Sequence, residues 1–148
     1  MERYKVGYLA GVFDLFHVGH LNLIKRAKEK CEYLIVGALV DELVFEFKHS
    51  YPYISFEERK QILEAIRYVD EVVAVTAENH EKMKAWNCYH FDCLFSGDDY
   101  AGNPYWIQDC EALQSVGSNI EFFPYTKSTS STMIKAAISN FDKREGKK

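Results

Sequence analysis

Short apolar runs alternate with stretches of helical periodicity along the whole chain. Five runs have the length and the β-branched and aromatic content of strands; they are residues 4–11, 33–39, 71–75, 93–96 and 120–123. Five other segments carry apolar residues at helical spacing; they are residues 20–30, 56–66, 80–86, 106–116 and 131–140. Ser55 followed by Glu58 has the spacing of a capping box and supports a helix start there. This alternation predicts an α/β domain with a parallel sheet and right-handed crossovers.

For five strands we expect a doubly wound, Rossmann-like sheet with strand order 3-2-1-4-5 and helices on both faces. In that order the first and fourth strands are neighbours, and their connections leave in opposite directions, so a crevice opens at their carboxyl ends. The loops that would border this crevice are GVFDLFHVGH at 11–20 and SGDDYAGNP at 96–104. The connection at 45–53, which contains Lys48, is longer than a strand-to-helix unit requires, and long loops are often functional.

Length and composition limit the class of protein. A chain of 148 residues, 47% apolar and 15% aromatic, is typical of one globular domain, which we place at 1–141 with a basic tail at 142–148. The net charge of -4 argues against a nucleic-acid binder. No run approaches the roughly 18 apolar residues of a membrane span, and the N-terminus lacks a cleavable signal pattern, so we expect a cytoplasmic protein without a membrane partner. The four cysteines are scattered and are expected to be buried free thiols.

Two histidines stand three residues apart where the first strand gives way to a helix. His17 and His20 would project from the same side of the helix start, where unpaired backbone N–H groups and the helix dipole already favour an anion. Gly11 would let another group approach the end of the strand, and Gly19 costs the first helical turn about 1 kcal/mol, which a bulky ligand could offset. This pattern favours a phosphate cradle. A metal site lacks an evident third ligand, and ordinary surface histidines remain the simpler alternative.

The stretch G-x-F-D-x-x-H-x-G-H resembles the signature of the H-x-G-H nucleotidyltransferases. The similarity continues through DEL at 41–43 with Lys48, ERKQILEAIRYVDEVV at 58–73, GDD at 97–99 and FPYTKSTSSTMIK at 123–135. These segments look like the cytidylyltransferase branch, closest to the glycerol-3-phosphate cytidylyltransferases. The resemblance implies an enzyme that transfers CMP from CTP to a small phosphorylated alcohol and releases pyrophosphate, with Mg²⁺ accompanying CTP and no metal held by the protein. It also implies a homodimer.

The resemblance assigns roles to individual residues. His17 and His20 would contact the triphosphate, and Lys48 would reach from its loop to bridge the two reacting phosphates. The substrate-binding set is Asp14, Lys48, Arg59, Arg67 and His80. The nucleotide-binding set is Gly11, Val12, Phe13, Asp14, Gly19, Gly97, Asp98, Asp99, Tyr125, Thr126, Ser130, Ser131 and Thr132. From the residues alone, Asp14 could equally be a helix cap, the two arginines surface ion-pair partners and the two aspartates an acidic turn.

The chain departs from the family pattern at three positions. Tyr125 stands where arginine is expected, Ser128 where glycine is expected, and His80 where tryptophan is frequent. The resemblance implies sn-glycerol 3-phosphate as the acceptor, and because of these departures three alternatives stay open. The first is phosphocholine or phosphoethanolamine, held in an aromatic cage of Tyr100, Tyr105, Trp106 and Tyr125. The others are an adenylyltransferase and a nucleotide-binding regulator without turnover.

Overall fold

A computed structural model describes residues 3–124 and 131–145. Its strands are β1 (Tyr4–Gly11), β2 (Cys31–Leu39), β3 (Glu71–Val75), β4 (Cys93–Gly97) and β5 (Ile120–Phe123). Its α-helices are α1 (Val18–Glu29), α2 (Asp41–Lys48), α3 (Phe56–Glu64), α4 (Lys82–Tyr89), α5 (Pro104–Ser115) and α6 (Ser131–Glu145). A single 3₁₀ turn, Asp98–Tyr100, follows β4.

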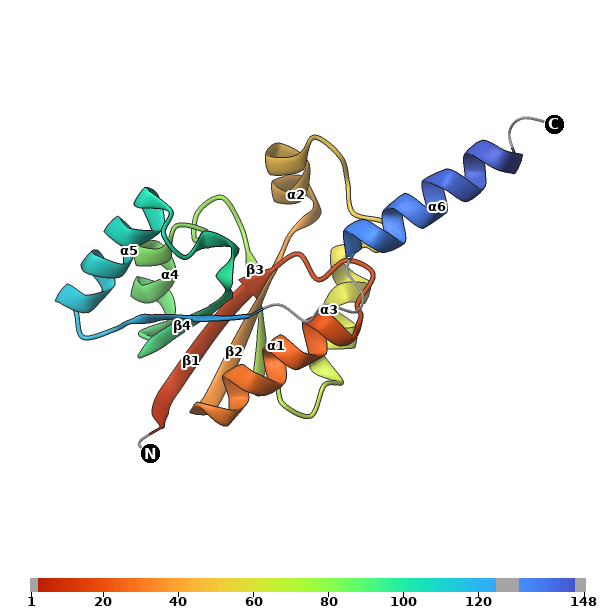
Figure 1. Ribbon diagram of the computed structural model, residues 1–148. Coiled ribbons are helices and arrows are strands. Elements are labelled where there is room, and N and C mark those ends of the chain that lie inside the picture. The colour runs from red at the N-terminus through yellow and green to blue at the C-terminus, as the bar shows by residue number, and fades with distance from the viewer. Residues whose placement is uncertain (1–2, 125–130, 146–148) are drawn as a thin grey trace.

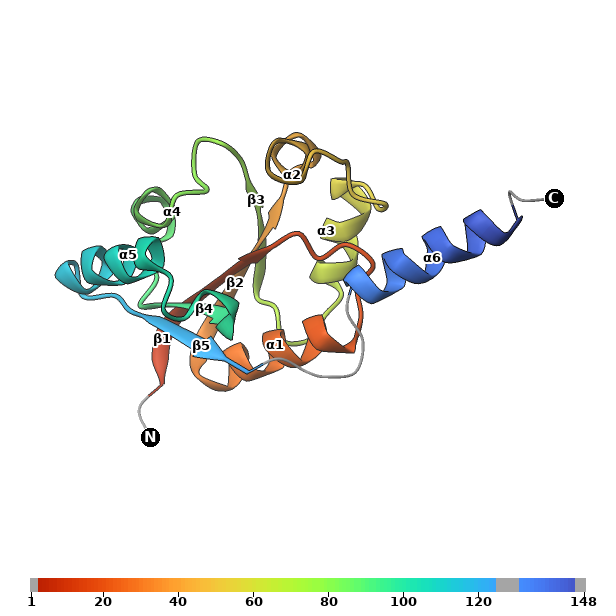
Figure 2. The same ribbon diagram turned by 45° about the horizontal axis from the view of Figure 1, so that its top comes forward.

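The five strands form one parallel sheet in the order β3-β2-β1-β4-β5, which confirms the predicted order. Helices α1 and α3 lie on one face of this sheet, and α4 and α5 lie on the other (Figures 1 and 2). Each face has its own apolar core: Ile24 and Leu63 pack into the first, and Ala85 and Leu113 into the second. The predicted doubly wound architecture is therefore confirmed.

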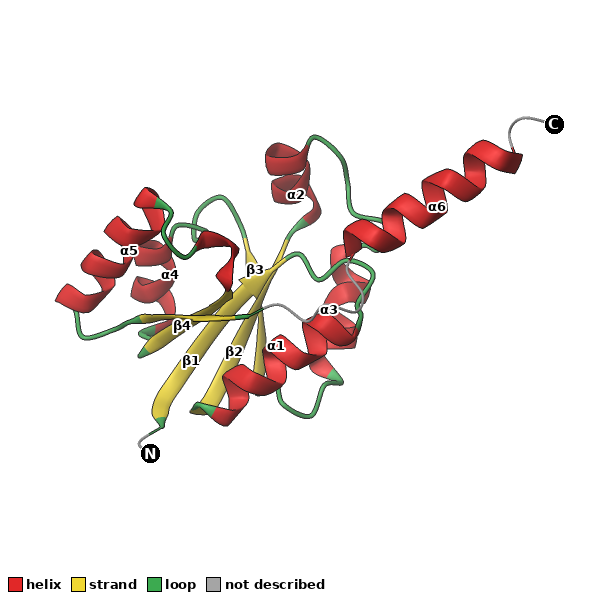
Figure 3. Ribbon diagram, in the orientation of Figure 1, coloured by secondary structure: helices red, strands yellow, loops and turns green. Residues whose placement is uncertain are grey.

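Helix α2 lies beyond the carboxyl ends of the strands (Figure 3). The predicted loop at 45–53 is wrong in its first half, because the chain is helical from Asp41 to Lys48. The helix buries Leu43 and Val44. Asp41 and Glu42 occupy its first turn, where the helix dipole stabilises negative charge. Lys48 is consequently the last residue of a helix, and the irregular connection is confined to residues 49–55.

Helix α6 projects away from the body of the molecule, with its first turns beside the loop after β1 and the loop before α3 (Figures 1 and 2). It continues to Glu145, past the boundary at 141–142 where we expect a tail to begin. Helix α3, in contrast, ends at Glu64, two positions before the predicted end. None of the helices in the described ranges is both long and apolar enough to cross a bilayer. All four cysteines are free; Cys31 and Cys93 are buried as predicted, whereas Cys88 is exposed and Cys110 is half-buried, so the predicted burial is wrong for these two.

Candidate active site

A cavity of about 520 Å³ opens at the carboxyl ends of β1 and β4, where the strand order reverses. Its wall is built from the ends of these strands, the loop after β1, and residues of α2, α4, α5 and α6. Of the predicted site residues, it brings together Gly11, Val12, Phe13, Asp14, His20, Lys48 and His80.

The loop that follows β1 has an unusual backbone. Phe13 and Leu15 both adopt left-handed conformations, with φ of 57° and 52°, and each such residue costs on the order of 1–2 kcal/mol. The Phe13 ring is buried and folds back over Gly11, so that a Cβ at Gly11 would lie 3.1 Å from it. The close approach predicted at Gly11 is therefore real, but the approaching group is a side chain of the same loop.

The two histidines cap α1 and each other. His17 is the N-cap residue, and its Nδ1 accepts a hydrogen bond from the Gly19 N–H at 3.0 Å. The His20 Nδ1 accepts from the His17 N–H at 3.3 Å, and the two rings stack with centroids 3.9 Å apart. A neutral imidazole that accepts at Nδ1 carries its proton at Nε2. Both rings therefore keep an Nε2–H donor, and of the two His20 lines the cavity whereas His17 does not.

Burial keeps this pair neutral. Desolvation lowers the pKa of His20 to about 4, with a further contribution from His17, and only the nearby Asp14 opposes the shift. Desolvation also lowers the pKa of His17. At neutral pH the rings are hydrogen-bond donors without a full charge, so positive charge in the cavity must come from other residues.

A pH titration tests this state of the pair. An unfolded histidine takes up its proton near pH 6.5, whereas folded His20 does so only near pH 4. Between these values the unfolded chain binds more protons, so the free energy of unfolding should fall as the pH is lowered from about 6.5 to about 4. An NMR titration should give a midpoint near 4 for His20 and below 6.5 for His17. A His20 midpoint at or above the unfolded value would contradict the neutral pair.

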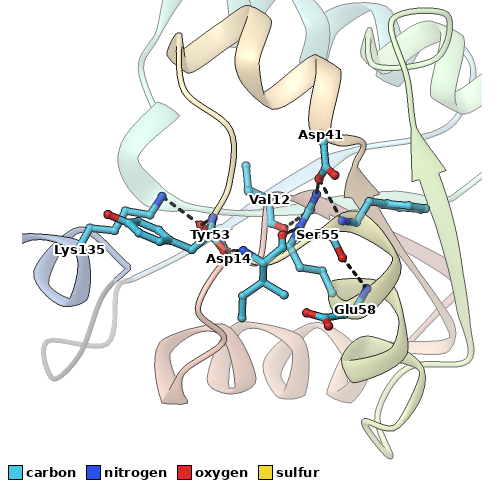
Figure 4. A network of polar contacts seen from close by, with 10 residues as sticks. Val12, Asp14, Asp41, Tyr53, Ser55, Glu58 and Lys135 are labelled. Carbon is cyan, nitrogen blue, oxygen red and sulfur yellow. Dashed lines mark hydrogen bonds and ion pairs between the residues drawn. The ribbon is translucent and has the colours of Figure 1, made fainter. Parts of the chain in front are cut away.

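Asp14 connects three segments that are distant in sequence (Figure 4). It is 2% exposed, and its oxygens accept hydrogen bonds from the N–H groups of Tyr53 at 2.8 Å and Ile54 at 2.9 Å. The Lys135 Nζ of α6 lies 3.2 Å from the same carboxylate. Burial alone would raise the pKa of Asp14, but these donors hold it below its ordinary value. Asp14 thus positions the 49–55 loop and α6 in the cavity wall. It is not the cap of α1, because His17 is, and its predicted ligand contacts stay predictions.

Arg59 is a structural residue, which corrects its predicted contact with substrate. Its side chain is fully buried, with Nε donating to the Ile54 carbonyl at 2.9 Å, one terminal nitrogen to the Val12 carbonyl at 2.7 Å and the other to Asp41 at 2.7 Å. Figure 4 labels two of the residues that accept these hydrogen bonds, Val12 in the loop after β1 and Asp41 at the start of α2. A group so enclosed supports the loop beneath the cavity and does not reach into it.

Arg67 lies outside the site altogether. Because α3 ends at Glu64, Arg67 falls in the connection that enters β3, at the amino ends of the strands. It is exposed to solvent there. Within this chain Arg67 therefore lies away from the cavity, contrary to its predicted place in the substrate-binding set.

Lysines supply the positive charge of the cavity. Lys48 ends α2, Lys82 begins α4, and Lys135 extends from α6, so that three elements each contribute one ammonium group to the wall. Partial desolvation lowers the pKa of Lys48, and the charge of Lys135 adds to this shift. At the mouth, His80 packs edge-on against the Phe47 ring, with centroids 5.2 Å apart. The sequence reasoning missed Lys82 and Lys135, although Lys135 closes the FPYTKSTSSTMIK segment.

The acidic turn lies at the rim of the cavity. Asp98 and Asp99 are exposed residues of the 3₁₀ turn after Gly97, whereas Ser96 and Tyr100 on either side of them line the wall. Gly19 lies in the first turn of α1, and Thr132 lies exposed in the first turn of α6, whose first residue is Ser131. The predictions for Tyr125, Thr126, Ser128 and Ser130 fall outside the described residues.

Nothing in the described parts of the chain forms a ready metal site. Within residues 3–124 and 131–145, no three histidine, cysteine, aspartate or glutamate side chains gather where they could hold a metal ion. Asp14, the one carboxylate among the described residues of the wall, already binds two backbone N–H groups and Lys135.

The chain is similar to known proteins along most of its length. The family description "Cytidylyltransferase-like" matches residues 8–137. The glycerol-3-phosphate cytidylyltransferase of Bacillus subtilis (strain 168) is 39% identical over 130 residues, which are 86% of this chain and 92% of that protein. The FAD synthase of Pyrococcus abyssi (strain GE5 / Orsay) is 48% identical over 118 residues, 76% of this chain and 74% of that protein.

A solved structure shares the fold. The lipopolysaccharide core biosynthesis protein of Thermoplasma volcanium GSS1 superimposes with a TM-score of 0.68 at 18% identity, over 85% of this chain and 99% of that one. At this identity the likeness concerns the architecture of the sheet and its helices alone.

Proposed function

Because the chain belongs to the cytidylyltransferase-like family and is a nucleotidyltransferase, we propose that it transfers CMP from CTP to a small phosphorylated alcohol, with sn-glycerol 3-phosphate as the acceptor. The products are a CDP-alcohol and pyrophosphate. The observation that carries the proposal is the meeting of His20, a neutral ring stacked on His17, with three lysines in one cavity. The similarity to the Bacillus subtilis enzyme supports CTP and glycerol 3-phosphate as the substrates.

The chemistry requires two anions to meet. A phosphate oxygen of the acceptor attacks the α-phosphorus of CTP in line, an O–P bond forms, and the bond to the leaving pyrophosphate breaks. The protein supplies no nucleophile in this scheme. It aligns the two phosphates and stabilises the charge that develops between them. The Nε2–H donors of His17 and His20 suit the triphosphate, and Lys48 suits the space between the two reacting groups.

Magnesium enters this scheme with the nucleotide. The described residues offer no set of carboxylates for it, since Asp14 is already bonded to Tyr53, Ile54 and Lys135. We propose that Mg²⁺ arrives as the complex with CTP and that the phosphate oxygens supply its ligands, as they commonly do for this ion.

We also propose a cytoplasmic homodimer. Four aromatic side chains of α2 and the loop after it are exposed; they are Phe45, Phe47, Tyr51 and Tyr53. Phe45 and Tyr51 stack, with ring centroids 4.7 Å apart, and Phe47 lines the cavity. Aromatic residues are enriched at surfaces that bind another protein. These side chains support a subunit contact close to the site.

Adenylyl transfer from ATP is the second candidate function. The similarity to the Pyrococcus abyssi FAD synthase favours it, because that relative shares a higher fraction of identical residues over a shorter alignment. The cavity volume of about 520 Å³ lies within the range of nucleotide and cofactor sites and does not separate the two candidates.

A panel of substrate pairs tests the proposal. Pyrophosphate release should be fastest with CTP and sn-glycerol 3-phosphate, and at least tenfold slower when ATP replaces CTP. Lys48→Ala should lose turnover with every acceptor while its thermal midpoint stays close to that of the wild type, because Lys48 is an exposed residue at the end of α2. Turnover with ATP and FMN alone would replace the proposal by the second candidate. CTP binding without turnover across the panel would indicate a regulator.

A further inference from the structure

Lys82 lines the cavity and packs against the ring of Trp106. The Lys82 Nζ at the start of α4 lies 3.6 Å from the centroid of the Trp106 ring of α5. It also lies 2.9 Å from an Asp109 carboxylate oxygen, and its side chain is only 16% exposed. Two contacts thus fix this ammonium group in the wall. Lys82 and Trp106 line the cavity, whereas Asp109 does not.

The aromatic residues around Lys82 do not form a cage for a ligand cation. Tyr100 stacks flat on Trp106, with centroids 4.6 Å apart and planes 4° from parallel. Tyr105 is 77% exposed and does not line the cavity. A cage needs free aromatic faces around an empty centre. Trp106 is instead packed against Tyr100 and Lys82, so Tyr100, Tyr105 and Trp106 do not form the predicted cage. Its fourth predicted member, Tyr125, lies outside the described residues.

The charged residues of the cavity wall also disfavour a ligand cation. Lys48, Lys82 and Lys135 all line the cavity, and Asp14 is the one carboxylate among the described lining residues. Asp14 is 2% exposed and fully engaged by Lys135 and the backbone of the 49–55 loop. An acceptor with an ammonium group would therefore find positive charge among the described residues of the wall, where the one carboxylate, Asp14, is already engaged.

We infer that Lys82 is a specificity-determining residue that rejects acceptors with a cationic head group, so that the enzyme uses phosphorylated alcohols whose remainder is neutral or anionic. The inference rests on the proposed function. It excludes phosphocholine and phosphoethanolamine as good substrates. Two like charges about 8 Å apart, at an effective dielectric constant of about 20, repel strongly enough to change an equilibrium constant by about 30-fold. Asp109 behind Lys82 reduces this repulsion, so we expect at least a tenfold effect.

The test compares two acceptors in four proteins. The quantity measured is the ratio of kcat/KM for sn-glycerol 3-phosphate to that for phosphocholine, with CTP as the donor. Lys82→Met keeps the length of the side chain and removes its charge, and it should lower this ratio at least tenfold. Lys82→Arg keeps the charge and should leave the ratio within threefold. Lys84→Met is the matched control from the same helix, because Lys84 is exposed and lies outside the cavity wall.

Each outcome decides the inference. It is overturned if the wild type uses both acceptors within threefold of each other. It is also overturned if Lys82→Met lowers kcat/KM for both acceptors in equal proportion, because Lys82 would then act on the phosphate that they share. A second measurement compares the dissociation constants of the two acceptors for protein saturated with α,β-methylene-CTP. These dissociation constants decide whether the head group is selected even if no substrate pair turns over. The absence of turnover would refute the proposed function alone.

Discussion

Replacing His20 with alanine should lower kcat by about 10²- to 10³-fold, the usual loss when one preorganised transition-state donor is removed. His17→Ala should lose a similar factor, because the two rings stack and cap each other through Nδ1. The loss should appear in kcat at saturating CTP, since the Nε2–H donors act most strongly on charge that develops during the reaction. Steady-state pyrophosphate release measures it.

Capping and catalysis by His20 can be separated. The Oδ1 atom of an asparagine can occupy the position of Nδ1, so His20→Asn should keep the acceptor for the His17 N–H while it lacks Nε2–H. We expect the free energy of unfolding of this variant to lie within about 0.5 kcal/mol of the wild-type value. Its kcat should fall by the same factor as that of the alanine variant. His90→Asn is the control, because His90 is exposed at the end of α4, with φ of 49°, and connects to the amino end of β4. Near wild-type turnover by a folded His20→Asn would refute the donor role.

Replacing Arg59 with methionine should lower the free energy of unfolding by about 3–4 kcal/mol, in the range found when one partner of a buried ion pair is removed. The substitution leaves the carbonyl groups of Val12 and Ile54 without their donors and Asp41 without its charged partner. Urea denaturation should show a lower midpoint with an unchanged m-value.

Arg67→Met provides the matched control for Arg59. Arg67 is exposed and lies in the connection to β3, so its replacement should change the free energy of unfolding by no more than about 0.5 kcal/mol. Equal destabilisation by the two substitutions would contradict the structural role assigned to Arg59. A loss of activity by Arg59→Met with unchanged stability would return this residue to the substrate-binding set.

Hydrophobic patterning predicted the sheet well because a strand buried on both faces must be almost wholly apolar. The predicted bounds of β1, β3 and β5 agree with the structure, and the strand order follows from the alternation of elements. The pattern missed α2, which is eight residues long and buries only Leu43 and Val44. Two buried positions do not distinguish a short helix from an irregular loop.

The candidate site was predictable in its location and less so in its details. Topology brings the loop after β1 to the carboxyl end of β4, so the neighbourhood of His20 could be predicted. The partner of each polar side chain depends on contacts between distant segments. Asp14 reaches residues 53, 54 and 135, and Arg59 reaches residues 12 and 41. Spacing within one helix carries no information about such contacts.

The central position of β1 shapes how the protein is assembled during synthesis. On one side β1 pairs with β2, beginning at Tyr4 and Cys31. On its other side β1 pairs with β4, where the partner of Gly7 is Cys93, a residue synthesised much later. As the chain emerges from the ribosome, the first three strands can associate while the second edge of β1 still lacks its neighbour. An unpaired edge of this kind is prone to wrong association with other nascent chains. Long-range parallel pairing is also slow to form, so the second half of the sheet should complete last.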